Sequence, residues 1–540
     1  MLDVVASRKQ ARARLPVKPP EHGELQLADG TRLVATIWRP DTAETLPVLL
    51  MRQPYGREIA STVTLAHPSW YAAHGYVVVI QDVRGAGDSE GDFEALANEA
   101  EDGAQTLEWA RNLPGSNGKI GTYGFSYQGT TQFLALAGGG KPDAMAVAMA
   151  SWNPVADWAS EGGLFRTAMA SGWAAQMARL KAHRLGDKQA LRELAPGKDW
   201  TDYFTFLTAR PDLSHLPSWA RGDVAANPSG LLNPPPPVPL LQTAGAADLF
   251  LRGTLAADTA FRAVSPETTH LILAPWGHIG WNRSSGAARL EAGAEFSVDR
   301  AQLAFFDHYL KGLGEMPAPL RAYDAGTDDW REVPLADLRG PASRHFALSS
   351  DGLAATLLSD GRLCEPFDAE FEEGFDVIVH DPLKPAPLVG GVVGTPPGPV
   401  DTGAHDDRAD VACYTTDPFA CAQTLIGQAE AKLSVGIDGN VTALGATLAL
   451  VTAEGASIAL ATTVAPVEAG RCRLTFEGLC RTLKPGEALR LAIQVAPCPQ
   501  FLPYPALDLP EPGVRAATVT LCHQASEFLL PMKDLGQSDA

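Results

Sequence analysis

The chain has 540 residues, of which 45% are hydrophobic and 20% charged, and its net charge is −20 at pH 7. This length and composition predict a soluble globular protein of about three domains. A strongly acidic chain argues against nucleic acid or anionic membrane partners, because both select for basic surfaces. No apolar run reaches the roughly 18 residues that a membrane helix needs. We therefore expect no nucleic acid partner and no membrane partner.

The cysteines and the N-terminus indicate in which cellular compartment the protein is expected. All seven cysteines lie in the last third of the chain, none before Cys364, and none forms a C-x-x-C pair. An odd number without metal-type spacing favours small buried thiols in a reducing compartment over a disulfide framework or a zinc site. The first 20 residues are basic but lack the apolar stretch of a secretory signal, so we expect a short disordered or edge-wrapping arm. Together these features predict a cytoplasmic protein whose last third is a separate domain.

Short β-branched runs alternate with a helical pattern between about residue 23 and residue 151. Apolar residues recur every three or four positions over residues 94–114, which predicts an amphipathic helix ended by Pro114. This order is typical of the βαβ unit of a doubly wound α/β domain with a parallel sheet. The expected strands are residues 46–53, 75–83 and 119–125.

The alternation stops after residue 151 and resumes after a run of prolines. Residues 152–232 are helix-like and rich in Trp and Ala, and NPPPPVP (233–239) must be extended because proline fixes φ and removes a donor. The pattern predicts a helical insertion within one α/β domain. After the prolines we expect strands at 238–245 and 270–277 and a closing helix at 300–314.

From about residue 317 the pattern changes to short strand-like pieces separated by Gly, Asp and Pro turns. Many short strands without intervening helices indicate a β-sandwich such as a jelly roll.

The stretch GTYGFSYQGT (121–130) follows an expected strand and precedes an expected helix, which is the context of a nucleophile elbow. Gly124 leaves room for the sharp turn, and the Tyr127 amide would lie at a helix N-terminus, where it can face a developing oxyanion. The usual pattern is G-x-S-x-G, whereas Gln128 occupies the second position after Ser126 and a glycine follows one position later. The decapeptide alone leaves two interpretations open, a nucleophile and an ordinary Gly-Ser turn.

A nucleophilic serine needs a base, and the base needs an orienting carboxylate. In doubly wound hydrolases these residues follow in the order Ser, acid, His, each after a later strand. Asp248 and His278 each follow an expected strand, at the sheet edge where such folds place their sites. We therefore predict a triad of Ser126, Asp248 and His278. His270 and His308 lack this context and are expected to be structural.

Tyr55 follows the expected strand at 46–53, after Pro54. A neutral phenol there is suited to donate a hydrogen bond to an oxyanion, beside the Tyr127 amide. An aromatic plug next to the site is the alternative interpretation.

Several segments in a fixed order carry a family likeness over nearly the whole chain. They are RQPYGR (52–57), QDVRGAGDSEGDF (81–93), EDGAQTLEWARNLPGSNGKIGTYGFSYQG (101–129), SWNPVADWASEGGLF (151–165), the Asp248 segment, APWGH (274–278) and the terminal β region. With these segments the chain resembles the cocaine esterase-like, or CocE/NonD, hydrolases. The X-prolyl dipeptidyl peptidases and the α-amino acid ester hydrolases are relatives of that family.

The resemblance implies that the elbow reads G-x-S-Y-x-G, which accommodates Gln128. It implies Ser126 as nucleophile, Asp248 and His278 as its triad partners, and an oxyanion hole made of Tyr55 and the Tyr127 amide, without a cofactor or a metal. The implied fold class is α/β, an α/β-hydrolase core with an inserted helical cap and a C-terminal all-β jelly-roll domain. The expected domains are residues 20–151 and 238–316 for the core, 152–237 for the cap and 317–540 for the jelly roll.

Two features bear on the substrate. The acid segment GAADLFLRG lacks the aromatic residue or glycine that many relatives carry just before the aspartate, so the acyl pocket is expected to differ. The α-amino acid ester hydrolases hold a substrate ammonium with carboxylates, for which only Asp157 and Glu161 are near in the sequence, and a solvated helix face explains both equally well. The cap also offers aromatic residues for an apolar pocket, although each can instead be a core residue. These are Trp152, Trp158, Phe165 and Trp173.

The sequence therefore predicts a serine hydrolase that cleaves an ester or amide bond of a small-molecule substrate. The alternatives are an X-prolyl dipeptidyl peptidase, an α-amino acid ester hydrolase or acylase, and, from another class, a non-catalytic ligand-binding protein with a vestigial core. The natural substrate is left open, and a homodimer is compatible with the sequence.

Overall fold

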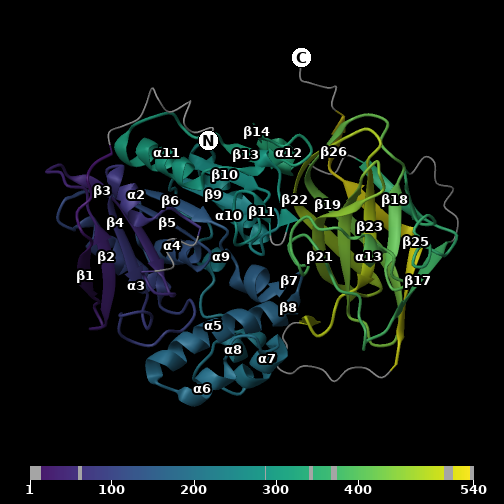
Figure 1. Cartoon of the computed structure of the whole chain (residues 1–540), viewed down its shortest axis with the longest axis horizontal. Coiled ribbons are helices and arrows are strands. Elements are labelled where there is room, and N and C mark those ends of the chain that lie inside the picture. Colours follow the sequence, from purple (N-terminus) through teal and green to yellow (C-terminus); the bar gives the residue numbers. More distant parts are fainter. Residues whose placement is uncertain are drawn as a thin grey trace.

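The computed structural model describes residues 14–58, 64–285, 288–339, 344–365, 374–503 and 515–534. The first 13 residues of the expected N-terminal arm lie outside the described residues. Figure 1 shows three parts, an α/β core, a helical cap below it, and an all-β region beside both. The predicted fold class, an α/β-hydrolase core with an inserted cap and a C-terminal all-β domain, is confirmed.

A ten-stranded sheet forms the centre of the core, in the order β1-β2-β4-β3-β5-β6-β9-β10-β13-β14. The strands from β4 to β13 are parallel to their neighbours, whereas β1, β2 and β14 pair antiparallel at the two edges. Parallel strands with helices on both faces are buried on both sides, which is why they read as continuous apolar runs. The strands are β1 (Glu21–Gln26), β2 (Arg32–Trp38), β3 (Leu46–Gln53), β4 (Val77–Asp82), β5 (Ser116–Phe125), β6 (Ala144–Ala148), β9 (Leu240–Gly245), β10 (Thr269–Ala274), β13 (Leu320–Asp324) and β14 (Asp329–Glu332).

Helices cover both faces of this sheet. Side chains of α3, α4 and α10 pack in the clusters on one face, and those of α2 and α11 pack with Tyr123 on the other. The closing helix predicted at 300–314 is α11, which ends at Gly312, a residue with φ of 66°. The helices are α2 (Pro68–Ala73), α3 (Glu99–Arg111), α4 (Tyr127–Ala137), α10 (Leu251–Val264) and α11 (Val298–Lys311), with 3-10 turns η4 (Pro266–Thr268) and η5 (Ala292–Ala294) and a small hairpin of β11 (Ser284–Ser285) and β12 (Ala288–Arg289).

The central sheet continues beyond the expected core boundary at residue 316. Strand β13 pairs parallel with β10, and β14 turns back against β13. Leu320 and Ala322 of β13 are buried in a cluster that also contains Ile426 of the β domain, so the two domains meet at this strand.

The cap lies between β6 and β9 in the chain and is mostly helical, as predicted. It begins with a π-helical turn and a hairpin and continues with five helices (Figure 1). Its elements are η3 (Pro154–Ala159), β7 (Ser160–Glu161), β8 (Leu164–Arg166), α5 (Thr167–Leu185), α6 (Lys188–Glu193), α7 (Trp200–Thr208), α8 (Leu216–Ala220) and α9 (Pro228–Leu231).

The C-terminal domain is an eleven-stranded sheet that closes on itself, because β25 pairs with β19 as well as with β17 and β15. Closure places a single apolar core inside, which includes Leu433, Leu474 and Phe528. Its elements are α12 (Leu335–Arg339), β15 (Arg344–Ser349), β16 (Arg362–Cys364), β17 (Phe375–His380), α13 (Gly403–Asp406), β18 (Ala412–Thr416), β19 (Gln423–Asp438), β20 (Ala443–Val451), β21 (Ser457–Glu468), β22 (Arg471–Leu483), β23 (Ala488–Val495), β25 (Ala517–Leu530) and β26 (Met532–Asp534).

One further strand of this domain, β24 (Phe501–Pro503), leaves it and pairs with β8 of the cap. It completes a three-stranded sheet with β7 and β8. The cap is therefore tied to the C-terminal domain by backbone hydrogen bonds.

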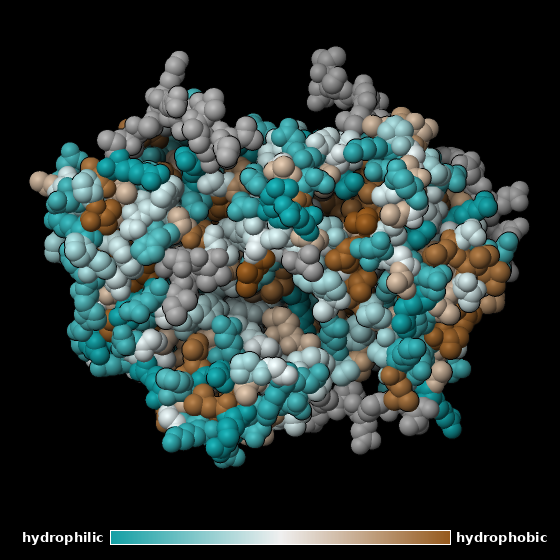
Figure 2. All heavy atoms as spheres, in the orientation of Figure 1, coloured by the Kyte–Doolittle hydropathy of each residue, from teal (hydrophilic) through white to brown (hydrophobic). Residues whose placement is uncertain are grey.

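The face of the molecule shown in Figure 2 is largely hydrophilic, with hydrophobic side chains gathered on the flank of the C-terminal domain. There β17 exposes Phe375, Val377 and Val379 in alternation with buried residues. None of the helices in the described residues is both long and apolar enough to cross a membrane.

A buried carboxylate in the C-terminal domain leads to a prediction about stability. Asp376 is fully buried and accepts hydrogen bonds from Ser350, Tyr414, His523 and the Ala354 amide. Burial by itself would raise the pKa of Asp376, but hydrogen bonds from His523, Tyr414 and Ser350 outweigh it and lower that pKa below 3.8. A lowered folded-state pKa adds stability above the unfolded pKa of about 3.9 that is lost as the pH falls through the folded value.

We expect Asp376→Asn to destabilise the domain by about 3 kcal/mol at pH 7, because an amide cannot accept all of these hydrogen bonds. Thermal unfolding followed by circular dichroism measures this effect, and its size should shrink below pH 4. Asp438→Asn, at an exposed position on β19, is the matched control. Equal melting temperatures for the two variants at pH 7 would contradict the prediction.

Candidate active site

Ser126 lies in the turn between β5 and α4, with φ of 59° and ψ of −129°. A positive φ is uncommon for a residue with a side chain, and it is the geometry of a nucleophile elbow that turns the hydroxyl toward the sheet edge. The Ser126 amide donates to the carbonyls of Ala148 and Met149, at 3.0 and 3.1 Å, which anchors the turn to the end of β6.

Two glycines and Gln128 explain the departure from the usual elbow pattern. A Cβ on Gly124, whose φ is 148°, would lie 2.5 Å from the Cβ of Gln128. The Gln128 side chain turns back to the strand and accepts a hydrogen bond of 3.2 Å from the Phe125 amide. A Cβ on Gly129 would lie 2.5 Å from that of Ala150, so this glycine allows α4 to approach the chain after β6.

The structure brings Ser126, His278 and Asp248 together, although 152 residues separate the first two. The Nε2 atom of His278 lies 2.9 Å from Ser126 Oγ, and its Nδ1 atom lies 2.6 Å from Asp248 Oδ2. Asp248 is fully buried and its other oxygen accepts a 2.8 Å hydrogen bond from the Phe250 amide. An ionised carboxylate held in this way fixes the imidazole with its Nε2 lone pair toward the serine.

Aromatic rings hold the imidazole of His278 on its sides. The rings of Phe125 and Phe250 each lie 5.4 Å from it, and Trp281 donates from its indole to the His278 carbonyl at 3.3 Å. No sequence motif pointed to these residues, although each lies within three positions of a predicted triad residue.

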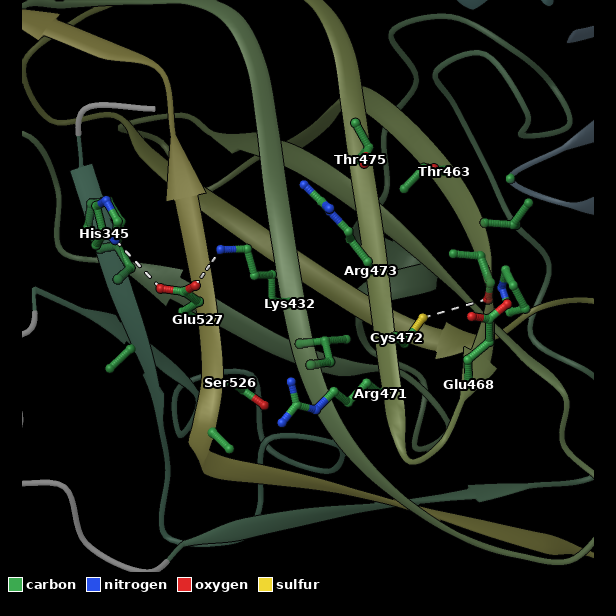
Figure 3. A pocket seen from close by; sticks show the side chains of 18 of the residues that line it. His345, Lys432, Thr463, Glu468, Arg471, Cys472, Arg473, Thr475, Ser526 and Glu527 are labelled. Atoms are coloured by element: carbon green, nitrogen blue, oxygen red, sulfur yellow. Dashed lines mark hydrogen bonds and ion pairs between the residues drawn. The ribbon is translucent and has the colours of Figure 1, made fainter. Parts of the chain in front are cut away.

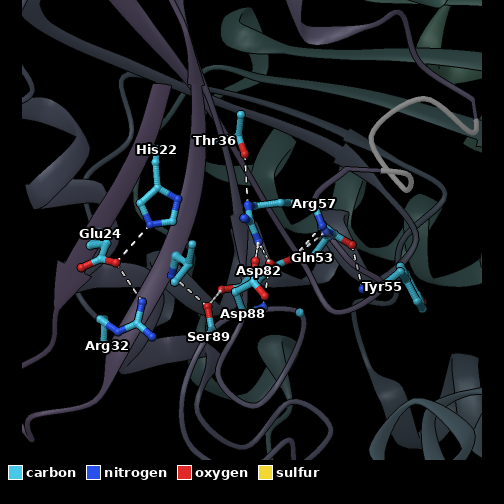
Figure 4. Close-up of polar contacts among 12 residues, drawn as sticks. His22, Glu24, Arg32, Thr36, Gln53, Tyr55, Arg57, Asp82, Asp88 and Ser89 are labelled. Atoms are coloured by element: carbon cyan, nitrogen blue, oxygen red, sulfur yellow. Dashed lines mark hydrogen bonds and ion pairs between the residues drawn. The ribbon is translucent and has the colours of Figure 1, made fainter. Parts of the chain in front are cut away.

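Tyr55 follows β3 in a turn that a buried carboxylate organises (Figure 4). Asp82, at the end of β4, accepts hydrogen bonds from Gln53 and from the amide and guanidinium of Arg57. Gln53 in turn accepts a 2.7 Å hydrogen bond from the Tyr55 amide. A Cβ on Gly87 would lie 2.1 Å from Asp82, so the glycine-rich segment after β4 is built to close over this carboxylate.

The hydroxyl of Tyr55 lies on the side of Ser126. It accepts a hydrogen bond of 3.2 Å from the indole nitrogen of Trp173, and Ser126 is its other polar neighbour. Burial raises the pKa of Tyr55 to about 12, and the side chains of Trp173 and Ser126 oppose that rise. The phenol is therefore a neutral hydrogen-bond donor over the whole working range of pH.

Tyr127 lies next to Ser126 with its backbone amide at the start of α4. Its amide is the first of α4, where the helix supplies no acceptor and the helix dipole favours negative charge. Its side chain points away and donates a 2.9 Å hydrogen bond to the buried Glu99. Burial first, and then the charge of Glu99, raises the pKa of Tyr127 well above 10.

The aromatic residues predicted in the cap have different positions. Trp158 and Trp173 lie beside the site with ring centroids 4.5 Å apart, and Trp158 also packs on Phe250 at 5.1 Å. Phe165 is fully buried in the same cluster, on β8. The structure places Trp152 elsewhere, in the cluster of α4 and α10, where its ring lies 5.1 Å from that of Phe133.

The two cap carboxylates considered for a substrate ammonium are buried, not on a solvated helix face. Asp157 accepts hydrogen bonds from Ser151 and from two backbone amides, and burial raises its pKa to about 6. Glu161 forms ion pairs with Arg166 and Arg252. Both carboxylates are thus already occupied by partners within the protein.

Known proteins match most of the chain. Residues 29–280 match the sequence profile of the X-Pro dipeptidyl-peptidase (S15 family), and residues 313–502 match that of the X-Pro dipeptidyl-peptidase C-terminal non-catalytic domain. The chain is 28% identical over 471 residues to the cocaine esterase of Rhodococcus sp. (strain MB1 Bresler), a match that covers 80% of each chain. These matches show a serine hydrolase and confirm the resemblance to the cocaine esterase-like hydrolases.

Solved structures confirm the fold. An aminopeptidase from the marine sediment archaeon Thaumarchaeota archaeon superposes with a TM-score of 0.72 at 19% identity, covering 95% of this chain and 96% of that one. An α-amino acid ester hydrolase gives a TM-score of 0.71 at 19% identity, with 98% and 99% of the two chains covered.

One cavity in the described part of the chain lies away from Ser126. It has a volume of about 800 Å³ and opens between the C-terminal domain, Arg252 and the cap turn at Gly162. On its wall Glu527 lies between His345 and Lys432, at 3.6 and 2.7 Å (Figure 3). Closer to the serine, a cavity of about 630 Å³ is lined by Phe93, His215 and Trp219, behind the aromatic layer.

No group of three or more His, Cys, Asp or Glu side chains that could hold a metal ion occurs among the residues that the structure describes.

Proposed function

We propose that this serine hydrolase cleaves an ester bond of a small acyl substrate, through an acyl-enzyme on Ser126. The observation that carries the proposal is the hydrogen-bonded chain from Ser126 to His278 to Asp248, with distances of 2.9 and 2.6 Å. Serine, base and carboxylate in these positions are the requirements for nucleophilic catalysis by a hydroxyl group.

In the first half of the reaction, Ser126 Oγ attacks the carbonyl carbon while its proton passes to His278 Nε2. The resulting imidazolium is stabilised by Asp248. The negative oxygen of the tetrahedral intermediate accepts hydrogen bonds from the Tyr55 hydroxyl and the Tyr127 amide. Each such donor contributes about 3–4 kcal/mol to stabilising the transition state. Collapse of the intermediate breaks the ester bond, and the alcohol leaves with the proton from His278.

In the second half, water attacks the acyl-enzyme carbonyl and gives its proton to His278 Nε2. The second tetrahedral intermediate uses the same two donors. It collapses to release the acid, and the proton returns from His278 to Ser126 Oγ, which regenerates the free enzyme.

The side chains around the serine favour an apolar, aromatic acyl group. Trp158, Trp173 and Phe250 surround the site from the cap and the core. A peptidase that recognises a free amino terminus needs a carboxylate at the pocket, and Asp157 and Glu161 are both engaged by internal partners. Ester hydrolysis also agrees with the relatives named cocaine esterase and putative serine esterase. The X-prolyl dipeptidyl peptidase remains the second candidate because of the matching family profile.

We also propose that the enzyme acts in a reducing compartment, the cytoplasm. The support for this location is that all seven cysteines are free thiols in the structure.

A fluorophosphonate probe tests the nucleophile. We expect stoichiometric labelling of the wild-type protein at Ser126, located by peptide mass spectrometry, because the probe reacts only with an activated serine. Ser126→Ala should not be labelled, whereas Ser160→Ala, at another buried serine in the cap hairpin, should be labelled like the wild type. Folded wild-type protein that resists the probe would rule out the proposed function.

Chromogenic substrates separate the two candidate activities. p-Nitrophenyl benzoate and p-nitrophenyl acetate report ester hydrolysis, and Gly-Pro-p-nitroanilide reports dipeptidyl peptidase activity. We expect turnover of both esters with the larger kcat/KM for benzoate, and turnover of the anilide alone would favour the peptidase.

A further inference from the structure

The indole of Trp173 forms a contact with the site that substrate packing does not require. Its Nε1 atom lies 3.2 Å from the hydroxyl oxygen of Tyr55, across 118 residues of sequence. Trp173 belongs to α5 of the cap, whereas Tyr55 follows β3 of the core. This hydrogen bond therefore connects the cap directly to one of the two donors that face Ser126.

The chemistry of the two side chains fixes the direction of this bond. An indole N–H can only donate, so the Tyr55 oxygen must be the acceptor. The hydroxyl of Tyr55 has a single proton, and the bond from Trp173 does not use it. The phenol proton is therefore free to point to the side of Ser126, its other polar neighbour.

The direction of the hydrogen bonds follows independently from the opposite end of the site. The ionised carboxylate of Asp248 only accepts, so Nδ1 of His278 carries the proton and Nε2 accepts from Ser126. The Ser126 oxygen is then available to accept from Tyr55 while its own proton points to His278. The bonds from Trp173 to Tyr55, from Ser126 to His278 and from His278 to Asp248 thus all have their donor on the Trp173 side.

We propose that Trp173 is a positioning residue that orients the Tyr55 hydroxyl through its indole N–H, so that the phenol proton faces the reacting carbonyl oxygen. This inference rests on the proposed function of Ser126 and deepens it. When a substrate binds, the Tyr55 hydroxyl keeps its proton and donates a hydrogen bond to the oxyanion. The bond from Trp173 blocks the orientations in which this hydroxyl proton points away. The donor is preorganised, which is the property that makes an oxyanion hole effective.

The indole itself is held from several sides. The rings of His215 and Trp158 lie 4.4 and 4.5 Å from it, and that of Trp219 lies 5.4 Å away. Burial lowers the pKa of His215 to about 3, so this ring stays neutral. It therefore adds no charge that could turn the Tyr55 hydroxyl. Rings packed in this manner restrict the indole to one rotamer, and its N–H stays aimed at Tyr55.

The test removes the indole N–H of Trp173 and keeps the shape of the side chain. Incorporation of 3-benzothienylalanine at position 173 exchanges the indole N–H for sulfur, and Trp173→Phe is the second variant in case the analogue does not incorporate or fold. We expect the analogue to lower kcat for p-nitrophenyl benzoate about tenfold, with KM changed less than twofold, since the lost bond acts on the transition state.

A double-mutant cycle provides a readout that a merely structural role would not affect. In a Tyr55→Phe background the phenol is absent, so the analogue at position 173 should cause no further loss of kcat. The analogue at position 152, where the indole packs against Phe133 outside the site, is the matched control and should leave kcat unchanged.

The outcomes separate this inference from the proposed function. Labelling of Ser126 by a fluorophosphonate, together with full kcat in both Trp173 variants, would overturn the inference and leave the proposed function intact. Equal losses with and without the Tyr55 hydroxyl would also overturn it, because the indole would then act only as packing. Wild-type protein that the probe does not label would remove the proposed function and the inference together.

Discussion

Replacing Asp248 with asparagine is expected to lower kcat for ester hydrolysis by about four orders of magnitude. The Asp248 carboxylate is fully buried, and its Oδ2 atom accepts a hydrogen bond of 2.6 Å from Nδ1 of His278. An amide can donate to Nδ1, which favours the tautomer with a proton on Nε2, and that tautomer cannot accept the proton of Ser126. The amide also provides no charge to balance the imidazolium, and these two losses together account for an effect of about 10⁴.

Stopped assays at high enzyme concentration measure this loss, and the melting temperature shows whether the fold survives. Asparagine keeps an oxygen that can accept from the Phe250 amide, so the fold should be retained. Asp407→Asn, at an exposed position in the C-terminal domain, serves as the control and should keep the wild-type kcat. A folded Asp248→Asn variant with more than a tenth of the wild-type kcat would show that another group orients His278.

Tyr55→Phe is expected to lower kcat by about 10²–10³, which corresponds to about 2.7–4 kcal/mol of lost transition-state stabilisation. The phenyl ring keeps its packing, while the hydrogen bond to the oxyanion is lost and only the Tyr127 amide remains. KM should change little, because the bond gains strength only as negative charge develops on the carbonyl oxygen. The affinity for a boronic acid that mimics the tetrahedral intermediate should fall by a similar factor.

The control for this variant is a tyrosine of the cap. The Tyr203 hydroxyl donates to the Ala195 carbonyl within the cap, so Tyr203→Phe removes a hydroxyl of the same kind without affecting the oxyanion. Because the pKa of Tyr55 is about 12, its contribution should stay constant from pH 6 to pH 10. A loss in Tyr55→Phe that changes with pH over this interval would contradict the role of the phenol as a neutral donor.

The strands of the core were predictable because parallel, doubly covered strands leave a local signal. The expected strand at 46–53 is β3 with the same bounds, and those at 75–83 and 238–245 are β4 and β9 with small differences at their ends. The helix expected from residue 94 begins only at Glu99. Leu96 has φ of 68° and its amide donates to the Tyr127 hydroxyl, a tertiary contact that overrides the helical spacing.

The residues of the site also differ in this respect. Some have a local signal in the sequence, whereas others depend on tertiary contacts. Ser126, Asp248 and His278 each end a strand, so the sequence identified them, and the structure brings them within hydrogen-bonding distance. The bond between Trp173 and Tyr55 depends on how the cap lies on the core, and no spacing in the sequence encodes it. Trp152 follows β6 closely, but only the packing around α4 decides that its ring points away from Ser126.

The pairing of β24 with β8 links the C-terminal domain to the helix that carries Trp173. Strand β8 leads directly into α5, and Phe501 pairs with Arg166 at that junction. A swing of the cap away from the C-terminal domain would have to break this ladder. We therefore expect that removing the C-terminal domain, whose matching profile is described as non-catalytic, would change substrate preference as well as stability.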